Sequence, residues 1–536
     1  MDKRLLIAFL ISFLIIFTYP KYLKLISKSS SKTSTDSVVV ATSNKEEELI
    51  LETRKIKEEK INEEISTLQN KKLIVEFTNI GAAIKAVYLR DYLLENGNDK
   101  LLSLYNFSHD HASDLIGFLR IGVADGGFIN DFKSITYRNI DSTLEDEIIY
   151  ESPSILGLKI LKKFSLEKDS YKINIKTVIK NLSNETRNIN VEFCSALDYE
   201  IKNRYDKHMV NTTIKSYNKL TSTKLNKIIK DGFLFQDKVD WLALEDKYFT
   251  VIIKPEYDIS QARVVAINDS TINSYIQSIN FSLKPQESIN KNSFLITGPK
   301  EHNILKKYNE GFEDIISRGF LGGLKVFLLI ILNFFYKLCH NYGFSIIILT
   351  VLIKILLSPL THKSFESMRK MQELQPQMKA LQEKHKENPQ QLNREVMELY
   401  KKHKANPFGG CLPILFQMPI FIALYQTLSR SVELRRANFI WWIKDLSEPD
   451  KMFPFPFNIP ILGDSFNLLP LLMMGSMVWQ QKLTPSASSK EQEKIMLIMP
   501  IVFGVMFYNL PSGLVLYWLV NNVLTIAHQL IMKKIK

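Results

Sequence analysis

The chain has 536 residues, a mean hydropathy of −0.05 and a formal net charge of +13. The positive charge comes without an arginine-rich stripe interleaved with aromatic residues, so no nucleic-acid partner is expected. The three cysteines, Cys194, Cys339 and Cys411, lie far apart and indicate neither a disulfide framework nor a metal site. The near-zero hydropathy averages two unlike parts: a polar, strand-like part at 70–300 and a strongly apolar part at 342–532.

Residues 1–20 predict an uncleaved transmembrane anchor with its amino end in the cytoplasm. Lys3 and Arg4 precede the apolar run LLIAFLISFLIIFTYP, and no small-residue cleavage site follows that would indicate a removed secretory signal. Residues 21–69 are first rich in Ser and Thr and then dense in mixed charges. This composition predicts a linker.

Residues 70–300 predict a large periplasmic antiparallel β-sandwich. In YKINIKTVIK (171–180), Tyr171 and every second residue after it share one face, and mostly Lys and Asn occupy the other. Similar short segments separated by Gly, Asn, Asp and Ser are found at 72–78, 83–89, 188–194, 247–253, 262–267 and 277–283.

This domain carries no recognisable catalytic motif. Its one notable cluster, His109-Asp110-His111, lacks a third ligand at a usual spacing and is interpreted as a polar loop. We therefore expect a binding or spacing module, with no metal and no cofactor.

Residues 301–341 predict an amphipathic helix that lies in the membrane interface. The apolar run at 326–335 is short, and one helical arc collects the polar or amphipathic side chains. These are Lys325, Asn333, Tyr336, Lys337 and His340.

Residues 342–532 predict five membrane spans. Together with the anchor at 1–20, they predict a multi-domain integral membrane protein with six spans. The five spans are 342–358, 411–429, 467–482, 495–510 and 513–532. The segment 361–407 carries ten Lys and Arg and is assigned to the cytoplasm, as is the tail 533–536. The spans are short, which predicts local thinning of the bilayer.

The segment 361–407 predicts a cytoplasmic helical hairpin. Met368, Met371 and Met378 lie on an apolar face at helical spacing, and ENPQQ interrupts the pattern. The methionine face is either an adaptable binding surface or simply the surface that the two helices bury against each other.

Lys354 is a cation within the apolar run TVLIKILLSP (350–359). Three interpretations stay open: its side chain reaches the interface, it forms an ion pair in a relay, or it lies in a water-filled cavity. None of the five spans contains Asp or Glu, which disfavours the ion pair. The same spans supply uncharged side chains suited to lining a cavity, some of which could equally bond helix to helix. They are Thr350, Gln417, Gln426, Gln480, Gln481, Tyr517, Trp518, Asn521 and Asn522.

Several stretches resemble the YidC family of bacterial membrane protein insertases, in the YidC/Oxa/Alb superfamily. The specific matches are NYGFSIIILTVLIKILLSPLT (341–361), NPFGGCLPILFQMPIFIALYQTL (406–428) and NLPSGLVLYWLVNNVLTI (509–526). The looser ones are KKFSLEKDSYKINIKTVIKNLSN (162–184) and DWLALEDKYFTVIIKP (240–255) in the sandwich.

The resemblance implies a five-helix core plus an anchor helix, and a periplasmic sandwich of galactose-mutarotase-like fold. It implies a hydrophilic groove, open to cytoplasm and lipid, in which a cation contacts incoming substrates. Lys354 matches that position, where the family usually has arginine. Lysine keeps the positive charge but lacks the planar guanidinium group of arginine. A mechanism in which the cation forms two parallel hydrogen bonds to a substrate carboxylate is therefore in doubt.

The expected function is insertion and folding of nascent membrane proteins at the inner membrane, alone or beside the Sec translocon. Both chain ends would be cytoplasmic, and membrane lipids and a ribosome or targeting receptor are the other partners considered. A solute or ion transporter that uses Lys354 for coupling or binding is the alternative. An intramembrane protease would have His528 as its lone candidate residue, without a visible partner.

Overall fold

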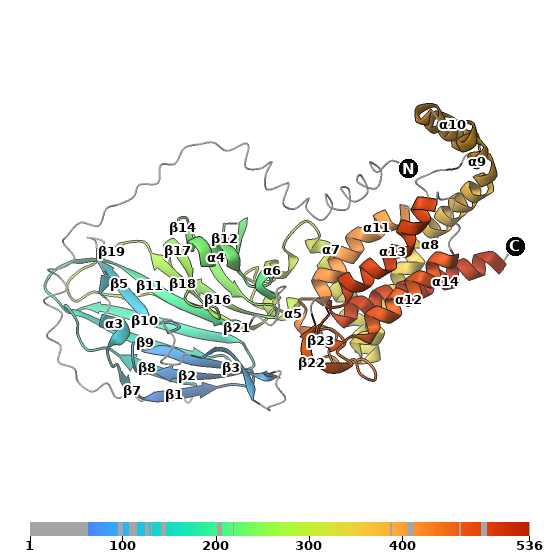
Figure 1. Cartoon of the computed structure of the whole chain (residues 1–536). Helices are drawn as coiled ribbons and strands as arrows, with labels where there is room; N and C mark the ends of the chain where they lie inside the picture. Colours follow the sequence, from blue (N-terminus) through green and yellow to red (C-terminus); the bar gives the residue numbers. More distant parts are fainter. Residues whose placement is uncertain are drawn as a thin grey trace. The chain divides into compact units, whose positions relative to one another are not determined.

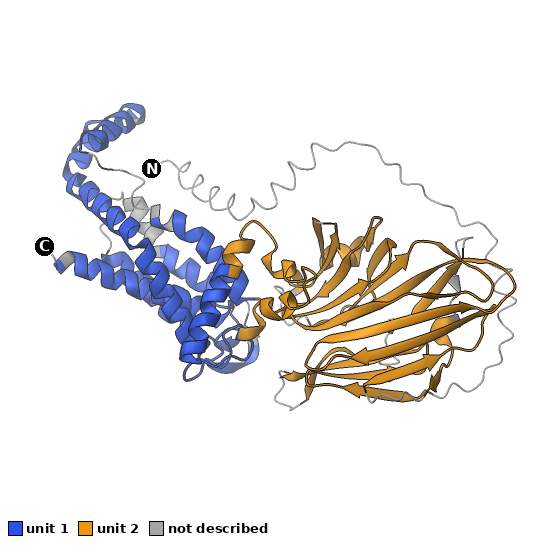
Figure 2. Cartoon of the chain, turned by 180° about the vertical axis from the view of Figure 1, so that it is seen from behind, with its two compact units in different colours: residues 1–58, 327–429, 434–536 blue, residues 59–326, 430–433 orange. Residues whose placement is uncertain are grey.

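The computed structural model describes residues 63–534 with short gaps. The gaps are 95–99, 107–114, 124–127, 130, 141–145, 201–205, 218, 386–387, 404, 406–411, 460–461 and 484–489. Two compact units are present in the described chain: 59–326 with 430–433, and 327–429 with 434–536 (Figure 2). The predicted anchor, most of the predicted linker and the His109-Asp110-His111 cluster lie outside the described residues.

The first unit contains three antiparallel sheets (Figure 1). The four-stranded sheet consists, in order, of β1 (Ile65–Gln69), β2 (Leu73–Thr78), β3 (Ala83–Leu93) and β4 (Leu101–Asn106). The ten-stranded sheet has the order β13 (Lys219–Lys224), β12 (Asn211–Ser216), β15 (Trp241–Glu245), β16 (Phe249–Pro255), β21 (Ser293–Pro299), β10 (Lys172–Asn181), β9 (Leu158–Leu166), β8 (Glu147–Glu151) and β7 (Arg138–Ile140), with β20 (Ser288–Asn290) on β10. The seven-stranded sheet has β14 (Phe233–Phe235), β17 (Ile259–Ala266), β18 (Thr271–Ser278), β11 (Arg187–Asp198), β5 (Leu119–Val123) and β6 (Phe128–Ile129), with β19 (Phe281–Leu283) on β11.

The sandwich is confirmed, and its core follows the predicted alternation. Along β10, Ile173, Ile175, Thr177 and Ile179 are buried, while the intervening side chains are half-buried or exposed. The neighbouring strand β9 alternates in the same way, with Ile175 opposite Phe164 in the register. One apolar core therefore continues across paired strands, as a period of two places every second side chain on the same face.

Two segment boundaries differ from the sequence-based expectation. The predicted linker runs to residue 69, yet Ile65–Gln69 forms β1 and pairs with β2. The predicted strand at 277–283 is two elements, because β18 ends at Ser278 and β19 begins at Phe281. β1 pairs with the strand that follows it after three residues, whereas β19 pairs with the distant residues Arg187–Ile189 of β11, a partner that local alternation does not report.

A fully buried lysine, Lys162 on β9, ties the sandwich together. Its Nζ donates to the carbonyl oxygens of Gly81 at 2.8 Å, Ala82 at 3.0 Å and Gly117 at 3.0 Å. All three acceptors have positive φ, so their carbonyls depart from the strand ladders and converge on the ammonium. Burial lowers the pKa of Lys162 to about 7.

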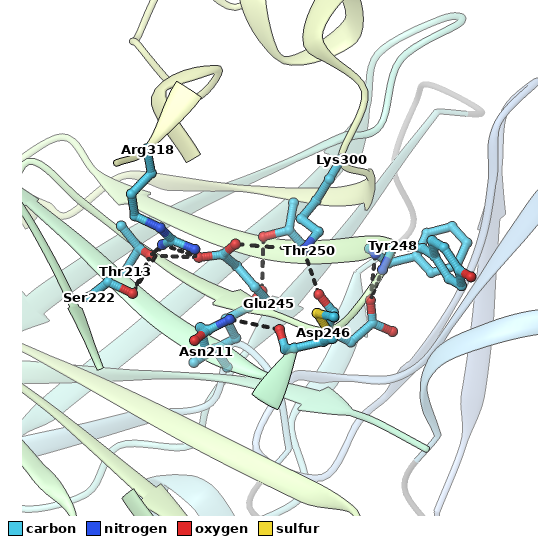
Figure 3. Close-up of polar contacts among 12 residues, drawn as sticks. Asn211, Thr213, Ser222, Glu245, Asp246, Tyr248, Thr250, Lys300 and Arg318 are labelled. Carbon is cyan, nitrogen blue, oxygen red and sulfur yellow. Dashed lines mark hydrogen bonds and ion pairs between the residues drawn. The ribbon is translucent and has the colours of Figure 1, made fainter. Parts of the chain in front are cut away.

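A buried ionic cluster fastens the end of this unit to the ten-stranded sheet (Figure 3). Arg318 donates to Glu245 at 3.1 Å and to Thr213, and the Lys300 Nζ lies 3.7 Å from the second Glu245 oxygen. Burial alone would raise the pKa of Glu245, but Arg318 and Lys300 hold that pKa below its usual value. The carboxylate is therefore charged, buried and dependent on its two cations.

Residues 301–317 belong to the sandwich and not to an interfacial helix. They form α5 (His302–Lys306) and α6 (Asp314–Ser317), and between these helices Phe312 is fully buried. The Phe312 ring makes an edge contact with Trp241 at 5.6 Å between centroids. These contacts bring two short helices into the core, in a part of the chain that the predicted boundaries had assigned to the interfacial helix region.

The predicted interfacial helix corresponds to α7 (Gly322–Cys339). Leu328, Leu329 and Leu332 are buried, whereas Phe327 and Phe334 are exposed. By length and composition α7 is long and apolar enough to cross a membrane, as are α8 and α14 among the described helices. Whether α7 lies in the interface or spans it stays a prediction.

The second unit is helical. Its remaining helices are α8 (Tyr342–Glu373), α9 (Gln375–Lys384), α10 (Pro389–Lys402), α11 (Leu412–Leu428), α12 (Leu468–Leu483), α13 (Lys490–Phe507) and α14 (Ser512–Lys534). Five of them match the five predicted spans, and α9 and α10 project from the bundle (Figure 1). One difference is that α8 runs unbroken through Pro359 into the predicted hairpin. Proline removes one backbone donor there, and the Thr361 hydroxyl bonds to the Leu357 carbonyl at 3.0 Å.

A capping loop, residues 438–459 and 462–467, connects the helix ends on one side of the bundle and includes the paired strands β22 (Phe453–Ile459) and β23 (Gly463–Phe466). The side chain of Asn341 caps α8 and donates to the carbonyls of Asn438 and Phe439. The Asp450 carboxylate accepts from the first two backbone N–H groups of α12, at 2.9 Å each. The carbonyls of Leu446 and Glu448 accept from the first N–H groups of α14. The starts of α8, α12 and α14 are therefore held at one level.

Replacing Arg318 by Leu should destabilise the sandwich by about 3–5 kcal/mol, because it leaves Glu245 buried without its main cation. Chemical unfolding of the full chain in detergent, followed by near-UV circular dichroism, measures this. Arg187→Leu is the control, since its pair with Glu185 is long and exposed and is worth at most about 1 kcal/mol. Equal losses in the two variants would contradict the prediction.

The unfolding free energy of the sandwich should rise between about pH 7 and pH 10. Lys162 has a folded-state pKa of about 7, below its ordinary value, so the folded chain binds fewer protons than the unfolded chain across this window. Lys162→Met should flatten the rise, while Lys163→Met, at a partly exposed neighbour paired with Glu147, should keep it. Identical pH profiles of all three chains would show that Lys162 is not the cause.

Candidate functional site

Lys354 lies on α8, where its side chain is half-buried against α14. Its Nζ donates to the Thr525 hydroxyl at 2.6 Å, and that hydroxyl donates in turn to the Asn521 carbonyl at 2.6 Å. Within the described part of the chain, no carboxylate forms an ion pair with Lys354. A neutral acceptor leaves the positive charge uncompensated, and an uncompensated charge at this position attracts anionic groups.

One face of α14 collects the polar groups near Lys354. Tyr517, Asn521, Thr525 and His528 are spaced by four, four and three residues, so they lie above one another on the helix. Tyr517 is almost fully buried, and its hydroxyl accepts from the Gln417 amide of α11 at 3.1 Å. The face therefore runs from the α8 contact at Thr525 to the α11 contact at Tyr517.

Asn522 lies beside this face and joins two helices. Its Nδ2 donates to the Ser476 hydroxyl of α12 at 3.0 Å, and Ser476 donates to the Met473 carbonyl. Both side chains are buried. In this arrangement the amide bonds helix to helix, which is the second of the two roles that the sequence left open for these residues.

Two of the residues predicted to line a cavity make packing contacts instead. The Thr350 hydroxyl donates to the Ile346 carbonyl of its own helix at 2.6 Å and is almost fully buried. Trp518 packs in an aromatic cluster, stacked on Phe503 and edge-on to Phe421. Their contacts favour packing roles.

The other predicted lining residues occupy intermediate positions. Gln426 on α11, Gln480 and Gln481 on α12, and Asn521 on α14 are all half-buried. Their placement is compatible with lining a partly hydrated surface, and their roles stay predictions.

One functional candidate escaped the sequence reasoning, and a second was named there without a partner. Thr525 is the hydroxyl partner of Lys354, and its four-residue spacing from Asn521 was the available signal. His528 had no visible partner in the sequence, but its ring lies 5.7 Å from Phe365 and 6.5 Å from His362, both on α8. Across the described residues no group of three metal-ligating side chains occurs.

The three methionines of the predicted hairpin differ in burial. Met378 on α9 is buried, and its sulfur accepts from the Tyr400 hydroxyl of α10 at 2.8 Å. Met368 and Met371 belong to the last turns of α8 and are half-buried. Packing between α9 and α10 accounts for Met378, and a binding role for Met368 and Met371 remains a prediction.

Comparison with known proteins covers nearly all of the described chain. The family described as 60Kd inner membrane protein matches residues 334–536, and the family described as YidC periplasmic domain matches residues 66–331. The membrane protein insertase YidC of Pelobacter propionicus is 33% identical over 465 residues, covering 86% of this chain and 84% of that protein. The YidC of Endomicrobium trichonymphae is 37% identical over 410 residues, covering 75% and 76%.

Solved structures give weaker likenesses. A crystal structure of an active YidC insertase covers 87% of this chain and 92% of its own, at 16% identity and a TM-score of 0.37. A putative aldose 1-epimerase from Escherichia coli covers 44% of this chain and 99% of its own, at 11% identity and a TM-score of 0.34. Since both TM-scores are below 0.5, assignment to a family rests on the sequence matches.

Replacing Thr525 by Val should destabilise the helical bundle by about 1–3 kcal/mol, because the half-buried Lys354 ammonium then loses its acceptor. Thr525→Ser keeps the hydroxyl and should retain most of that stability. The measurement is the thermal unfolding midpoint of the purified chain in detergent. A valine variant as stable as the serine variant would show that the hydrogen bond contributes nothing measurable.

Proposed function

The chain belongs to the YidC family of membrane protein insertases, and we propose that Lys354 and the polar face of α14 form its substrate-contacting groove. Nascent membrane proteins are the substrates that the family implies. The proposal concerns how this chain handles them: a short hydrophilic flank binds at the groove while the adjoining apolar segment enters lipid.

The observation that carries the proposal is the state of Lys354. Its ammonium bonds to the Thr525 hydroxyl rather than to a carboxylate among the described residues. A charge at the centre of a bilayer costs on the order of 2.5–3.5 kcal/mol, and one nearer the boundary carries part of that cost, so an uncompensated charge within a span marks a functional position. An acidic substrate flank would supply the missing counter-charge when it arrives.

The direction of entry follows from the two ends of the bundle. The capping loop occupies the end at which α8, α12 and α14 begin. The other end carries α9, α10 and most of the ten Lys and Arg of 361–407, which the positive-inside rule assigns to the cytoplasm. These features support a cytoplasmic carboxyl end and a substrate path that starts on the side of Lys354 and His528.

Insertion by this route requires no covalent step. Burial of the substrate's apolar area contributes about 25 cal/mol per Å². The membrane potential adds roughly 2.3 kcal/mol per charge per 100 mV for acidic flanks that cross. By offering a cation and bonding groups, the groove reduces the barrier to moving the flank.

Further partners are part of the proposal. Cooperation with the Sec translocon, and delivery by a ribosome or targeting receptor, are inferred from the family resemblance. Family membership places the chain in the inner membrane with a periplasmic domain, and the family is not one of enzymes. The transporter alternative is not supported, because the named relatives are insertases.

Lys354→Ala should reduce insertion of a single-span substrate with an acidic flank at least several-fold, because the groove loses its cation. Lys354→Arg should retain insertion, since only the charge is required. The measurement is protease protection of the substrate in proteoliposomes that contain no other protein. A substrate with an uncharged flank serves as the control and should be less affected. Equal insertion by all three chains would mean that Lys354 merely reaches the interface.

A further inference from the structure

The capping loop presents large apolar side chains to its surroundings. The exposed fractions are 83% for Trp441, 67% for Phe457, 47% for Phe453, 43% for Met452 and 38% for Ile440. Lys444 and Lys451 are also exposed and flank these residues in the sequence. Such a concentration of exposed aromatic surface in a single loop marks an interaction site.

A hydrogen-bonded turn of the loop keeps the Trp441 side chain exposed. Trp441 has φ of 51°, a strained conformation for a bulky residue, and the Ile443 N–H closes the turn on the Ile440 carbonyl at 3.1 Å. Its ring stacks on Trp442, whose Nε1 donates to the buried Asp450 carboxylate at 2.8 Å. A conformation with this cost persists only because the surrounding contacts enforce it.

The depth of the loop is set by the helices that it caps. Asp450 also accepts from the first N–H groups of α12. The same carboxylate therefore holds the Trp442 ring and caps the start of α12. At α8, the Phe439 ring occupies the space that a side chain at Gly343 would need, 1.9 Å from an ideal Cβ. The loop therefore lies at the level where the spans begin.

Exposed apolar residues of α8 lie next to the loop. Phe344, on the first turn of α8, is 47% exposed and makes an edge contact at 5.4 Å with Phe439, which is itself buried and precedes the exposed Ile440. Farther along α8, Ile348 and Ile355 are also exposed. The exposed side chains of the loop therefore begin one residue beyond a contact with α8, so a bilayer that covers Phe344 reaches the loop.

We propose that the capping loop is a lipid-binding surface, seated in the headgroup region of the leaflet opposite the cytoplasm. Trp is the residue enriched at that boundary, where an apolar ring body and a polar N–H both find partners, and lysines meet lipid phosphates there. Trp441 and the exposed phenylalanines anchor the loop, and Lys444 and Lys451 bind the headgroups. This inference does not depend on the role of Lys354.

A nitroxide label placed at Trp441→Cys in proteoliposomes tests the proposal. The background carries Cys339→Ser and Cys411→Ser, and Cys194 is fully buried and unreactive in the folded chain. Collision of the label with oxygen, which concentrates in lipid, is compared with collision with a water-soluble nickel chelate. Lys168→Cys, on an exposed turn of the sandwich, gives the aqueous reference, and Ile355→Cys gives the deep reference.

The expected result is an oxygen-to-nickel ratio between the two references, with nickel access reduced several-fold relative to Lys168→Cys. Nickel access as high as at Lys168 would place the loop in water and overturn the proposal. Loss of access to both reagents would show a protein partner or second copy covering the loop, which also overturns it. If the Trp441 variant fails to fold, Phe457→Cys gives the same comparison at a second exposed position.

Discussion

The helical bundle is joined by polar contacts that α14 makes with its neighbours, and the hydrogen bond between Lys354 and Thr525 is one of them. It links α8 to α14, whose polar face also contacts α11 through Tyr517 and, one residue along, α12 through Asn522. One helix thus makes polar contacts with three others. In an apolar solvent such polar contacts position helices more specifically than packing of apolar side chains does, because each unsatisfied hydrogen-bonding group raises the free energy of the bundle.

The two ends of the bundle solve the problem of unpaired helix termini differently. At one end the capping loop supplies acceptors to the starting N–H groups of α12 and α14 and bonds to the side chain that caps α8. At the other end α8 simply continues past Pro359, and α9 and α10 project away. At the first end the backbone N–H groups of the helix starts have acceptors, whereas at the second end α9 and α10 have few neighbouring helices. Local stability is therefore expected to be lower at the end that carries α9 and α10, which is the end at which the proposed function has substrates enter.

The sequence predicted features that repeat locally and missed those that depend on distant partners. Apolar runs located the helices α8, α11, α12, α13 and α14, and alternation located β10 with its buried Ile173 and Ile175. The acceptor of Lys354 lies 171 residues away, so nothing in the run around Lys354 indicates Thr525. Likewise, the carbonyls that bind Lys162 come from turns 45 to 81 residues distant. Thr350 was misleading for the opposite reason, since its hydroxyl bonds within its own helix.

Short helices and a fixed outer end together change the position of Lys354 in the bilayer. α11 and α12 have 17 and 16 residues, which span about 24–26 Å at 1.5 Å per residue against a hydrocarbon core of about 30 Å. If the capping loop keeps one end at the headgroups, the shortfall of about 4–6 Å falls on the cytoplasmic side. Lys354 follows the start of α8 by 12 residues, or about 18 Å. The Cα atom of Lys354 then lies about 6–8 Å from the nearer boundary, a distance that a lysine side chain can bridge to reach water. A short hydrated path of that kind allows the charge to remain while a substrate flank approaches it.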